Sequence, residues 1–328
     1  MGKVTLKDLS KILNISVSTI SKALNDSTEI STKTKKRVLK TVEIYGYQPN
    51  LIAKRLKSGK TFTFAVVIPS IQDSFFVRVL HGIEEAASIT EYNLITCSTR
   101  NSYAKEVETI KSLSNGLVDA IIIAVSEETQ VKQDFSHLSG LEDEMPLLIV
   151  DRDVKSINCD KVLVNDYEAV LNAVNGLISD GRKSIALVSC INNSSVGKLR
   201  TKGYINAISN TQDTIIIEGS EEHIEKELSS LIAKKNIDAI MALDQESSLA
   251  AYRVGKKKEV LTNKNIAIIG YASRVISEHL TPKLTTIDQH GKKVGITSAK
   301  LLLKRLDKFD GEFESVIVNS TVQKRFTS

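Results

Sequence analysis

The sequence contains no apolar run near the roughly 18 residues that a membrane helix needs, and its first residues lack the apolar core of a secretory signal. Its three cysteines (Cys97, Cys159 and Cys190) lie far apart and follow no metal-ligand spacing, and neither do its five histidines. We therefore expect reduced cysteines that serve as small apolar residues, no metal or cofactor, no membrane partner and a cytoplasmic location.

Catalytic signatures are also missing from the chain. It has no GxGxxG after its first apolar run, no GxxxxGK[ST], no GxSxG and no HExxH. The stretch SSVGK at residues 194–198 is similar to part of a phosphate-binding loop but lacks the leading glycine. An enzyme is therefore not expected.

Basic charge is concentrated at the N-terminus. Residues 1–60 hold 13 Lys and Arg against 4 Asp and Glu, a net charge of +9, whereas the other 268 residues hold 31 against 35, a net of −4. Basic side chains often do no more than solvate exposed helix faces. Here, however, the excess coincides with a DNA-binding pattern, which favours a nucleic-acid partner.

That pattern lies in residues 4–25, VTLKDLSKILNISVSTISKALN, which predict two short helices joined by a tight turn. Thr5 is expected to cap the first helix with Asp8 near its positive end, and Ser16 to cap the second. Asn14 suits the turn because it tolerates a left-handed conformation. The apolar positions are Leu6, Leu9, Ile12 and Leu13 in the first helix and Val17, Ile20, Ala23 and Leu24 in the second.

One face of the second helix carries only small or short polar side chains before a lysine, namely Ser18, Thr19, Ser21 and Lys22. A helix that lies deep in the DNA major groove needs such residues, because bulky ones would hold it off the base edges. The segment therefore predicts a helix-turn-helix that binds DNA sequence-specifically.

A third helix is expected from a cap at Ser31 to about Tyr45, with Gly46 ending it. Val38, Val42 and Tyr45 are expected to face inward. The cations of this helix are expected to form mainly a solvated face, with one or two reaching phosphates; they are Lys33, Lys35, Lys36, Arg37 and Lys40.

A hinge follows the three helices. Pro49 disfavours helix at the residue before it, and Asn50 is expected to cap a short helix that runs through Lys57. About seven helical residues are marginal alone, because helix nucleation is costly. We expect this segment to be ordered only by a partner, either DNA or its own copy in a second subunit.

From Thr63 onward, short apolar runs alternate with helical stretches such as residues 76–89. The runs are FAVVIP, NLITCS, AIIIAV, PLLIVD, KVLVND, IALVSC, TIIIEG, AIMALD, IAIIGY, LTTID and SVIVNSTV. Continuous Val and Ile runs are typical of strands buried on both faces, which predicts a doubly wound parallel α/β architecture. About eleven strands exceed one comfortable sheet, so two subdomains are expected.

The sequence thus predicts an all-α helix-turn-helix domain at 1–48, a hinge helix and linker at 49–60, and an α/β core at 61–328, which the family resemblance described below implies to be effector-sensing. Within the core we expect an N-subdomain at about 61–161 plus 290–320, and a C-subdomain at about 162–289 plus the C-terminal segment. Ligands of such folds bind beyond the carboxyl ends of the strands, between the two lobes. The loops expected there are 69–76, 151–153, 165–166, 192–200, 244–246 and 271–274.

In four ordered elements (VTLKDLS, SVSTISKALN, YGYQPN and AKRLKSG) the chain resembles LacI/GalR-type transcriptional regulators, and the resemblance continues through the core. It implies a helix-turn-helix followed by a periplasmic-binding-protein-like sensor. It also implies that Val17, Ser18 and Lys22 read bases, with a lysine discriminating less sharply than the arginine of many relatives. Phosphate contacts are implied for Thr5, Thr19, Ser21, Asn25 and Asn50.

In the hinge, Leu56 matches the leucine that such proteins wedge into the minor groove, and Ala53 is placed with it among the DNA-binding residues. An apolar contact between two hinge helices is the alternative role for Leu56.

For the cleft, the resemblance implies that Arg200 clamps effector oxygens, because its guanidinium suits sugar hydroxyls or a carboxylate. Asp151 would accept hydroxyls, and Phe75 or Phe76 would stack on an apolar sugar face. Asp244 and Gln289 would line the far side. The alternatives are that Asp151 and Asp244 cap helices and that the two phenylalanines belong to the core.

Two positions depart from the family pattern. Relatives commonly carry Asp where this chain has Ala272 and a polar group where it has Leu243, and both groups hydrogen-bond effector hydroxyls. Their absence argues against an ordinary monosaccharide in the usual pose. Either Ser273 or Arg274 compensates, or the effector is larger, phosphorylated or a protein.

The expected function is a transcriptional regulator, a repressor, that binds a pseudo-palindromic double-stranded DNA operator at the nucleoid. Its operator affinity would be controlled by a small-molecule effector in the cleft, a carbohydrate or derivative. A homodimer is expected, and a dimer is favoured over a tetramer because no heptad extension ends the sequence. The alternatives are a solute-binding protein of the same core fold without a transcriptional role, and an α/β enzyme fused to a DNA-binding module.

Overall fold

The computed structural model describes residues 4–47, 59–209, 213–234, 237–261 and 266–328. The chain divides into two compact units, Met1–Lys60 and Thr61–Ser328. The expected hinge helix, with Asn50, Ala53 and Leu56, lies outside the described residues. In the described part of the chain, none of the helices combines the length and the apolar character of a membrane span.

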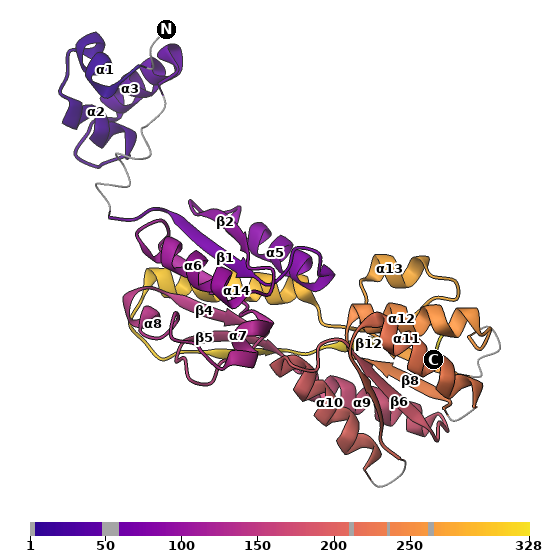
Figure 1. The fold of residues 1–328 in the computed structure, drawn as a ribbon. Helices are drawn as coiled ribbons and strands as arrows, with labels where there is room; N and C mark the ends of the chain where they lie inside the picture. The colour runs from indigo at the N-terminus through magenta and orange to yellow at the C-terminus, as the bar shows by residue number, and fades with distance from the viewer. Residues whose placement is uncertain (1–3, 48–58, 210–212, 235–236, 262–265) are drawn as a thin grey trace. The chain divides into compact units, whose positions relative to one another are not determined.

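Among its described residues, the first unit has the helices α1 Leu6–Leu13, α2 Val17–Leu24 and α3 Thr32–Tyr45 (Figure 1). The expected caps are confirmed. The Thr5 side chain accepts from the Asp8 amide in a capping box, and the side chains of Ser16 and Ser31 accept from the third amide of their helices. The two left-handed stops are also present, at Asn14 (φ 50°) and Gly46 (φ 59°).

The core of this unit consists of Leu9, Leu13, Ile20, Ala23, Val38 and Tyr47. Two predicted inward residues are instead exposed, Ile12 at 44% and Tyr45 at 47%. Around the helix axis Ile12 is turned about 100° from Leu13 and about 60° from Leu9, so it lies at the edge of the buried stripe. Tyr45 is displaced because the chain reverses at Gly46 and Tyr47 fills that end of the core.

The second unit contains two six-stranded sheets, and all eleven predicted runs form strands. The first sheet has the order β11-β5-β4-β3-β1-β2 and is parallel throughout. The second has the order β12-β10-β9-β8-β6-β7 and is parallel except that β12 runs antiparallel to β10. The doubly wound α/β fold class is therefore confirmed.

The bounds of the strands are β1 Thr63–Ile68, β2 Asn93–Ser98, β3 Ala120–Ile123, β4 Leu147–Val150, β5 Asp160–Val164, β6 Ile185–Ser189, β7 Ile215–Glu218, β8 Ala239–Ala242, β9 Ala267–Gly270, β10 Thr285–Asp288, β11 Ser315–Val318 and β12 Thr321–Gln323. The helices of this unit are α5 Ser74–Ala87, α6 Tyr103–Ser114, α7 Glu127–Lys132, α8 Leu141–Glu144, α9 Asp166–Ser179, α10 Ser195–Ile208, α11 Glu221–Ala233, α12 Gln245–Lys257, α13 Arg274–His279 and α14 Gly291–Asp307.

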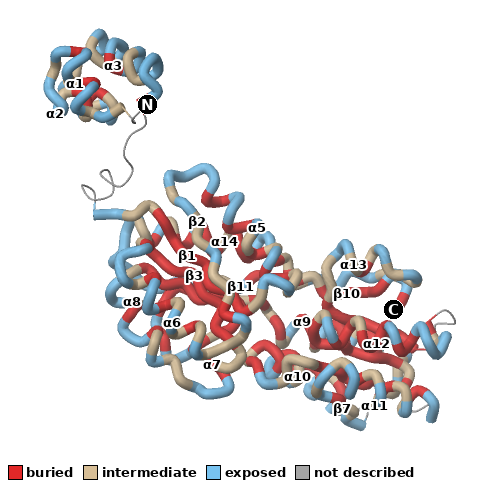
Figure 2. Tube along the Cα trace, turned by 45° about the horizontal axis from the view of Figure 1, so that its top comes forward, coloured by how far each residue is buried: buried red, intermediate tan, exposed pale blue. Residues whose placement is uncertain are grey.

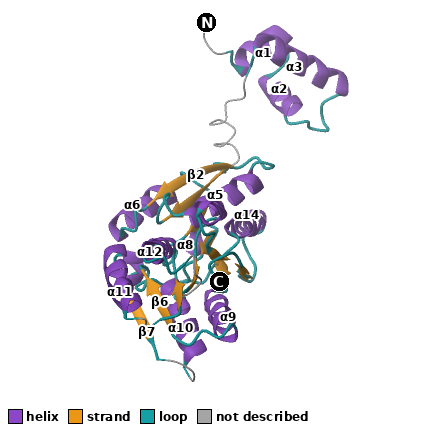
Figure 3. Ribbon diagram, turned by 90° about the vertical axis from the view of Figure 1, so that its right-hand side faces the viewer, coloured by secondary structure: helices purple, strands orange, loops and turns teal. Residues whose placement is uncertain are grey.

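Helices cover both faces of each sheet, so the inner strands β1, β3, β4, β6, β8 and β9 are buried at every residue, whereas the edge strands β2, β7, β11 and β12 are partly exposed (Figure 2). In the first lobe, α5 and α14 pack on the face that carries Phe64 and Val66, and α6 and α8 pack on the face that carries Ala65 and Val67. In the second lobe, α11 and α12 pack on one face, and α9 and α10 on the other (Figure 3).

The chain passes between the lobes after β5, after β10 and after β11. The first passage follows Val164, slightly later than the expected point near Val162, because β5 pairs with β4 and β11 in the first sheet. The run SVIVNSTV was expected to be one strand but forms two, one in each sheet. The break occurs at Ser320, whose amide donates to Asn165 Oδ1 at 2.7 Å.

Candidate functional site

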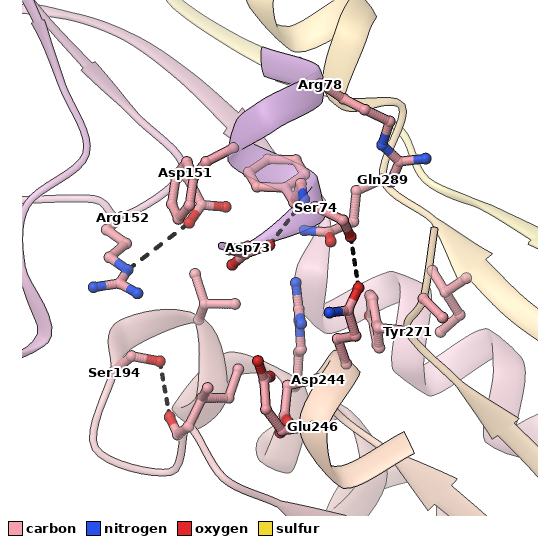
Figure 4. A pocket seen from close by; sticks show the side chains of 18 residues that line it. Asp73, Ser74, Arg78, Asp151, Arg152, Ser194, Asp244, Glu246, Tyr271 and Gln289 are labelled. Carbon is pink, nitrogen blue, oxygen red and sulfur yellow. Dashed lines mark hydrogen bonds and ion pairs between the residues drawn. The ribbon is translucent and has the colours of Figure 1, made fainter. Parts of the chain in front are cut away.

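A cavity lies between the two lobes, at the carboxyl ends of strands from both sheets (Figure 4). Its outline encloses about 630 Å³ of space free of atoms, a figure that includes open solvent, and its lining combines charged, polar and apolar side chains from both lobes. All six predicted effector residues line it: Phe75, Phe76, Asp151, Arg200, Asp244 and Gln289. They come together because parallel strands direct the loops that follow them to one edge of each sheet.

Arg200, on α10, is buried and held by fixed partners. Its Nε donates to Asp166 Oδ1 at 2.7 Å, its Nη1 donates to the Leu243 carbonyl, and its guanidinium lies 3.9 Å above the Tyr271 ring. Although burial opposes the charge, Asp166 keeps the pKa of Arg200 above its ordinary value. A guanidinium has five N–H groups, so these bonds and the Nη2 contact with Asp166 leave two for other acceptors.

Asp151 directly follows β4 and adopts a left-handed conformation, with φ of 67°. The residue is only 8% exposed, and within the described part of the chain no donor contacts its Oδ1. Burial raises the pKa of Asp151 to about 7, Asp166 adds to the increase, and Arg152 and Arg200 oppose it. Arg152 does not neutralise Asp151 fully, because its Nη1 is bonded to the Val125 carbonyl and its Nε is 3.9 Å from Asp151 Oδ2.

Asp244 caps α12 in a capping box with Ser247, as the alternative interpretation predicted, and its Oδ2 also accepts from the Cys190 amide at 2.8 Å. It lines the cavity at the same time. Burial raises the pKa of Asp244 and of its neighbour Glu246, because a desolvated carboxylate is less stable than the neutral acid.

The two phenylalanines fit both roles considered for them, as core residues and as an apolar surface of the cavity. Phe75 and Phe76, in the first turn of α5, belong to the buried cluster that α5 forms with the first sheet; their ring centroids are 5.3 Å apart, and both line the cavity. Gln289 follows β10 and is 7% exposed.

Several lining residues were not predicted, among them Asp73, Arg78, Arg152, Glu246 and Tyr271. Each lies in or beside a loop that the strand pattern already places at the cleft. The pattern of apolar runs predicts which loops lie at the cleft, but it does not indicate which side chains of those loops point into the cavity.

The two departures from the family pattern have different consequences. Ala272 lines the cavity, whereas Leu243 contributes the carbonyl that holds Arg200. Neither Ser273 nor Arg274, the residues suggested as compensation, is among those that line the cavity. Ser273 caps α13, and Arg274 pairs at the surface with Glu278 at 2.9 Å.

Hydrogen bonds join the lobes around the cavity. Ser74 Oγ donates to Gln245 Oε1 at 2.7 Å. The Gln130 side-chain amide donates to Ser195 Oγ at 2.8 Å and accepts from the Ser195 amide at 3.0 Å. These contacts hold the lobes together in the arrangement that the structure describes.

In the first unit, the predicted base-reading residues lie on the outer face of α2. Val17 is 38% exposed, Ser18 and Lys22 are exposed, and Lys22 forms an ion pair with Glu29. The predicted phosphate contacts are partly engaged within the unit. Thr5 and Thr19 take part in the caps, the Asn25 side chain donates to the Ser21 carbonyl at 2.9 Å, and Ser21 is half-buried.

Comparison with known proteins covers both units. Residues 61–326 match the family described as periplasmic binding proteins and sugar binding domain of LacI family, and residues 5–50 match bacterial regulatory proteins, lacI family. Curated relatives include catabolite control protein A of Priestia megaterium, 28% identical over 93% of both chains. They also include the HTH-type transcriptional repressor PurR of Photobacterium profundum, 26% identical over 92% of both.

Solved structures show the same fold. The lac repressor dimer bound to operator and the anti-inducer ONPF superposes with a TM-score of 0.85 at 19% identity, over 99% of both chains. A LacI family regulator from Enterococcus faecium with bound ribose has a TM-score of 0.69 at 25% identity, over 81% of this chain and 98% of that one.

The helix-turn-helix unit and the two-lobed core together define a DNA-binding transcriptional regulator rather than an enzyme. The chain belongs to the LacI family of these regulators. The alternative of a solute-binding protein without a transcriptional role is inconsistent with the family match at residues 5–50.

Proposed function

We propose that this regulator is a homodimeric repressor whose operator affinity is set by a small molecule bound in the cavity between the lobes. The observation that carries the proposal is the cavity itself, since its lining comes from both lobes. A molecule that contacts both lobes favours one lobe arrangement, and it then affects DNA binding to the extent that the two arrangements differ in operator affinity.

On the DNA, Val17, Ser18 and Lys22 read bases in the major groove of each half-site. Their exposure on α2 supports this role. Thr5, Thr19, Ser21 and Asn25 contact the phosphate backbone. The hinge residues Asn50, Ala53 and Leu56 contribute to phosphate and minor-groove contacts, and these roles stay predictions from the family resemblance.

In the cavity, Asp151 and Arg200 make the polar contacts with the effector. Gln289 and Asp244 line the opposite part, and Phe75 and Phe76 supply the apolar surface. A carbohydrate or a derivative is the proposed effector class, consistent with the two N–H groups of Arg200 that remain for ligand oxygens.

A mobility-shift assay with genomic fragments tests the DNA-binding half of the proposal. Affinity should fall steeply with salt, by about 0.9 log unit per log unit of salt for each phosphate neutralised, while a preference for one pseudo-palindromic sequence persists. Repeating the assay with a small-molecule extract of cells tests the sensing half. Operator affinity that no extract changes would rule out effector control, and a monomer without sequence preference would rule out the dimeric repressor.

A further inference from the structure

The side chains that line the cavity are unequal in charge and in how firmly they are held. Four carboxylates line it, those of Asp73, Asp151, Asp244 and Glu246, against three guanidiniums, those of Arg78, Arg152 and Arg200. The labelled carboxylates surround the cavity from both lobes (Figure 4). Carboxyl groups therefore outnumber guanidiniums around the cavity, although burial raises the pKa of Asp151, Asp244 and Glu246 and so favours their neutral forms.

The guanidiniums are further compensated by acceptors around the cavity. Arg200 is paired with Asp166, and Arg78 Nη1 lies 3.6 Å from Asp288 Oδ1. Arg152 Nη1 donates to Asn101 Oδ1 at 3.1 Å and to a main-chain carbonyl. A phosphate or carboxylate on the effector would have to compete with these acceptors and would face the four carboxylates as well.

Asp151 points to what the cavity receives. It is more than nine-tenths buried and lines the cavity, and no donor among the described residues reaches its Oδ1. A buried carboxylate without a hydrogen bond is costly, whereas a charge-assisted bond from an ammonium removes that cost. The Tyr271 hydroxyl, also buried in the lining and without a hydrogen-bond partner in the described part of the chain, is a second free polar group.

We propose that the effector carries a protonated nitrogen group that bonds to Asp151, with Asp73, Asp244 and Glu246 supplying the surrounding negative charge. Hydroxyl groups on the same molecule would accept from the free N–H groups of Arg200, and an apolar face would lie on Phe75 or Phe76. A small hydroxylated amine meets these requirements, and amino sugars are its simplest class. The inference rests on the proposed effector role of the cavity and specifies the chemistry of that site.

Matched sugars test the proposal on the full-length chain. Glucosamine, glucose and glucose 6-phosphate, with the galactose and mannose equivalents, would be compared by thermal shift and by titration calorimetry. At least one amine should bind ten-fold or more tightly than its neutral counterpart, and the phosphates should bind most weakly. An amine bound beside Asp151 should also release protons near pH 6.5, seen as a binding enthalpy that depends on the buffer.

Variants distinguish a specific bond between Asp151 and the amine from a general electrostatic attraction of the amine to the cavity. Asp151→Asn should remove most of the amine preference, and Glu246→Gln should reduce it if Asp151→Asn fails to fold. Asp153→Asn is the matched control, because Asp153 lies in the same loop but pairs with Lys161 at 2.7 Å and does not line the cavity. A preference that survives Asp151→Asn and Glu246→Gln would overturn the assignment.

Other outcomes distinguish this proposal from the proposed function. If the tightest binder is a neutral sugar or a phosphate, or if no amine binds, the cationic class is wrong. In either case a cell extract that still changes operator affinity would leave effector control intact. If the extract also has no effect, effector control itself fails.

Discussion

Single residues in the cavity combine high burial with charge, and Asp151 is the clearest case. Burial raises its pKa from 3.8 to about 7. Between those values the folded protein holds a proton on Asp151 that the unfolded chain has released. This stabilising contribution is present at acidic pH and is lost as the pH rises toward 7.

The variant Asp151→Asn cannot ionise and should therefore be more stable than the parent protein at pH 8 but not at pH 5. The expected gain in Tm is about 2–4 °C for each kcal/mol of desolvation that is relieved. Thermal unfolding of both proteins at the two pH values measures it. Asp143→Asn, on the exposed surface of α8, is the control and should show no such difference. A variant equally destabilised at both pH values would contradict the assignment.

Lys22 gives a residue-scale prediction for DNA. Lys22→Ala should lose about 1–3 kcal/mol for the preferred operator and little for unrelated DNA, because a base contact is lost. Competition binding on the two DNAs measures the difference. Lys36→Ala, an exposed lysine of α3, is the control and should weaken both DNAs equally if at all. Equal losses for Lys22→Ala would make Lys22 a phosphate contact.

At the scale of elements, the close packing of α5 against α14 fixes the segments that precede these two helices and line the cavity. The helices α5 and α14 approach closely at two glycines, where a Cβ at Gly82 would lie 2.1 Å from the Lys292 carbonyl oxygen and one at Gly295 would lie 2.0 Å from that of Val79. The residues before and at the start of α5 line the cavity, and Gln289 comes two residues before α14. The close packing therefore fixes the position of the start of α5 relative to Gln289 in the cavity lining.

Gly295→Ala should destabilise the core by about 1–3 kcal/mol, because backbone must move to admit the methyl group. Gly176→Ala, in the last turn of α9, is the matched control. No heavy atom of the described chain lies within 4 Å of a Cβ there, so alanine should stabilise by about 0.5–1 kcal/mol. Urea unfolding compares the two, and equal effects would show that the helices can separate without cost.

At the scale of the whole core, the lobes are joined by side-chain hydrogen bonds as well as by the three chain crossings. Gln130 is the most informative contact, since its amide group bonds to both the side chain and the backbone of Ser195. A typical hydrogen bond contributes about 0.5–1.5 kcal/mol, so loss of this contact should shift the lobes toward an open arrangement several-fold.

Gln130→Ala should therefore speed hydrogen exchange of the Ser195 amide at the start of α10, because that amide loses its acceptor. Exchange monitored by mass spectrometry on the full-length chain measures the effect. Gln133→Ala is the control at the C-cap of the same helix, since among the described residues the Gln133 side chain donates to the Gln130 carbonyl, within the lobe. Unchanged protection in Gln130→Ala would mean that the lobes stay closed without this contact.

Local patterns predicted much of the molecule. The caps at Thr5, Ser16 and Ser31 follow from short-range hydrogen bonding, and the eleven apolar runs follow from burial of strands on both faces. The six effector positions were placed correctly at one cavity, because the order of strands and loops along the chain already brings strand ends together. The exposure of Ile12 and Tyr45 was not predicted, since it depends on which helix covers which end of a small core.

The sequence by itself determined the elements, the family and the loops that meet at the cleft, because each of these depends on neighbours a few residues apart. Only the tertiary structure decided which charged side chains in the cavity have hydrogen-bond partners and which have a polar atom without one. Asp166 holds Arg200 across 34 residues of sequence and Leu243 holds it across 43, while Asp151 is left without a donor for its Oδ1 among the described residues. Charge balance in a buried site depends on distances in space, and for residues so far apart in the chain the fold alone sets those distances.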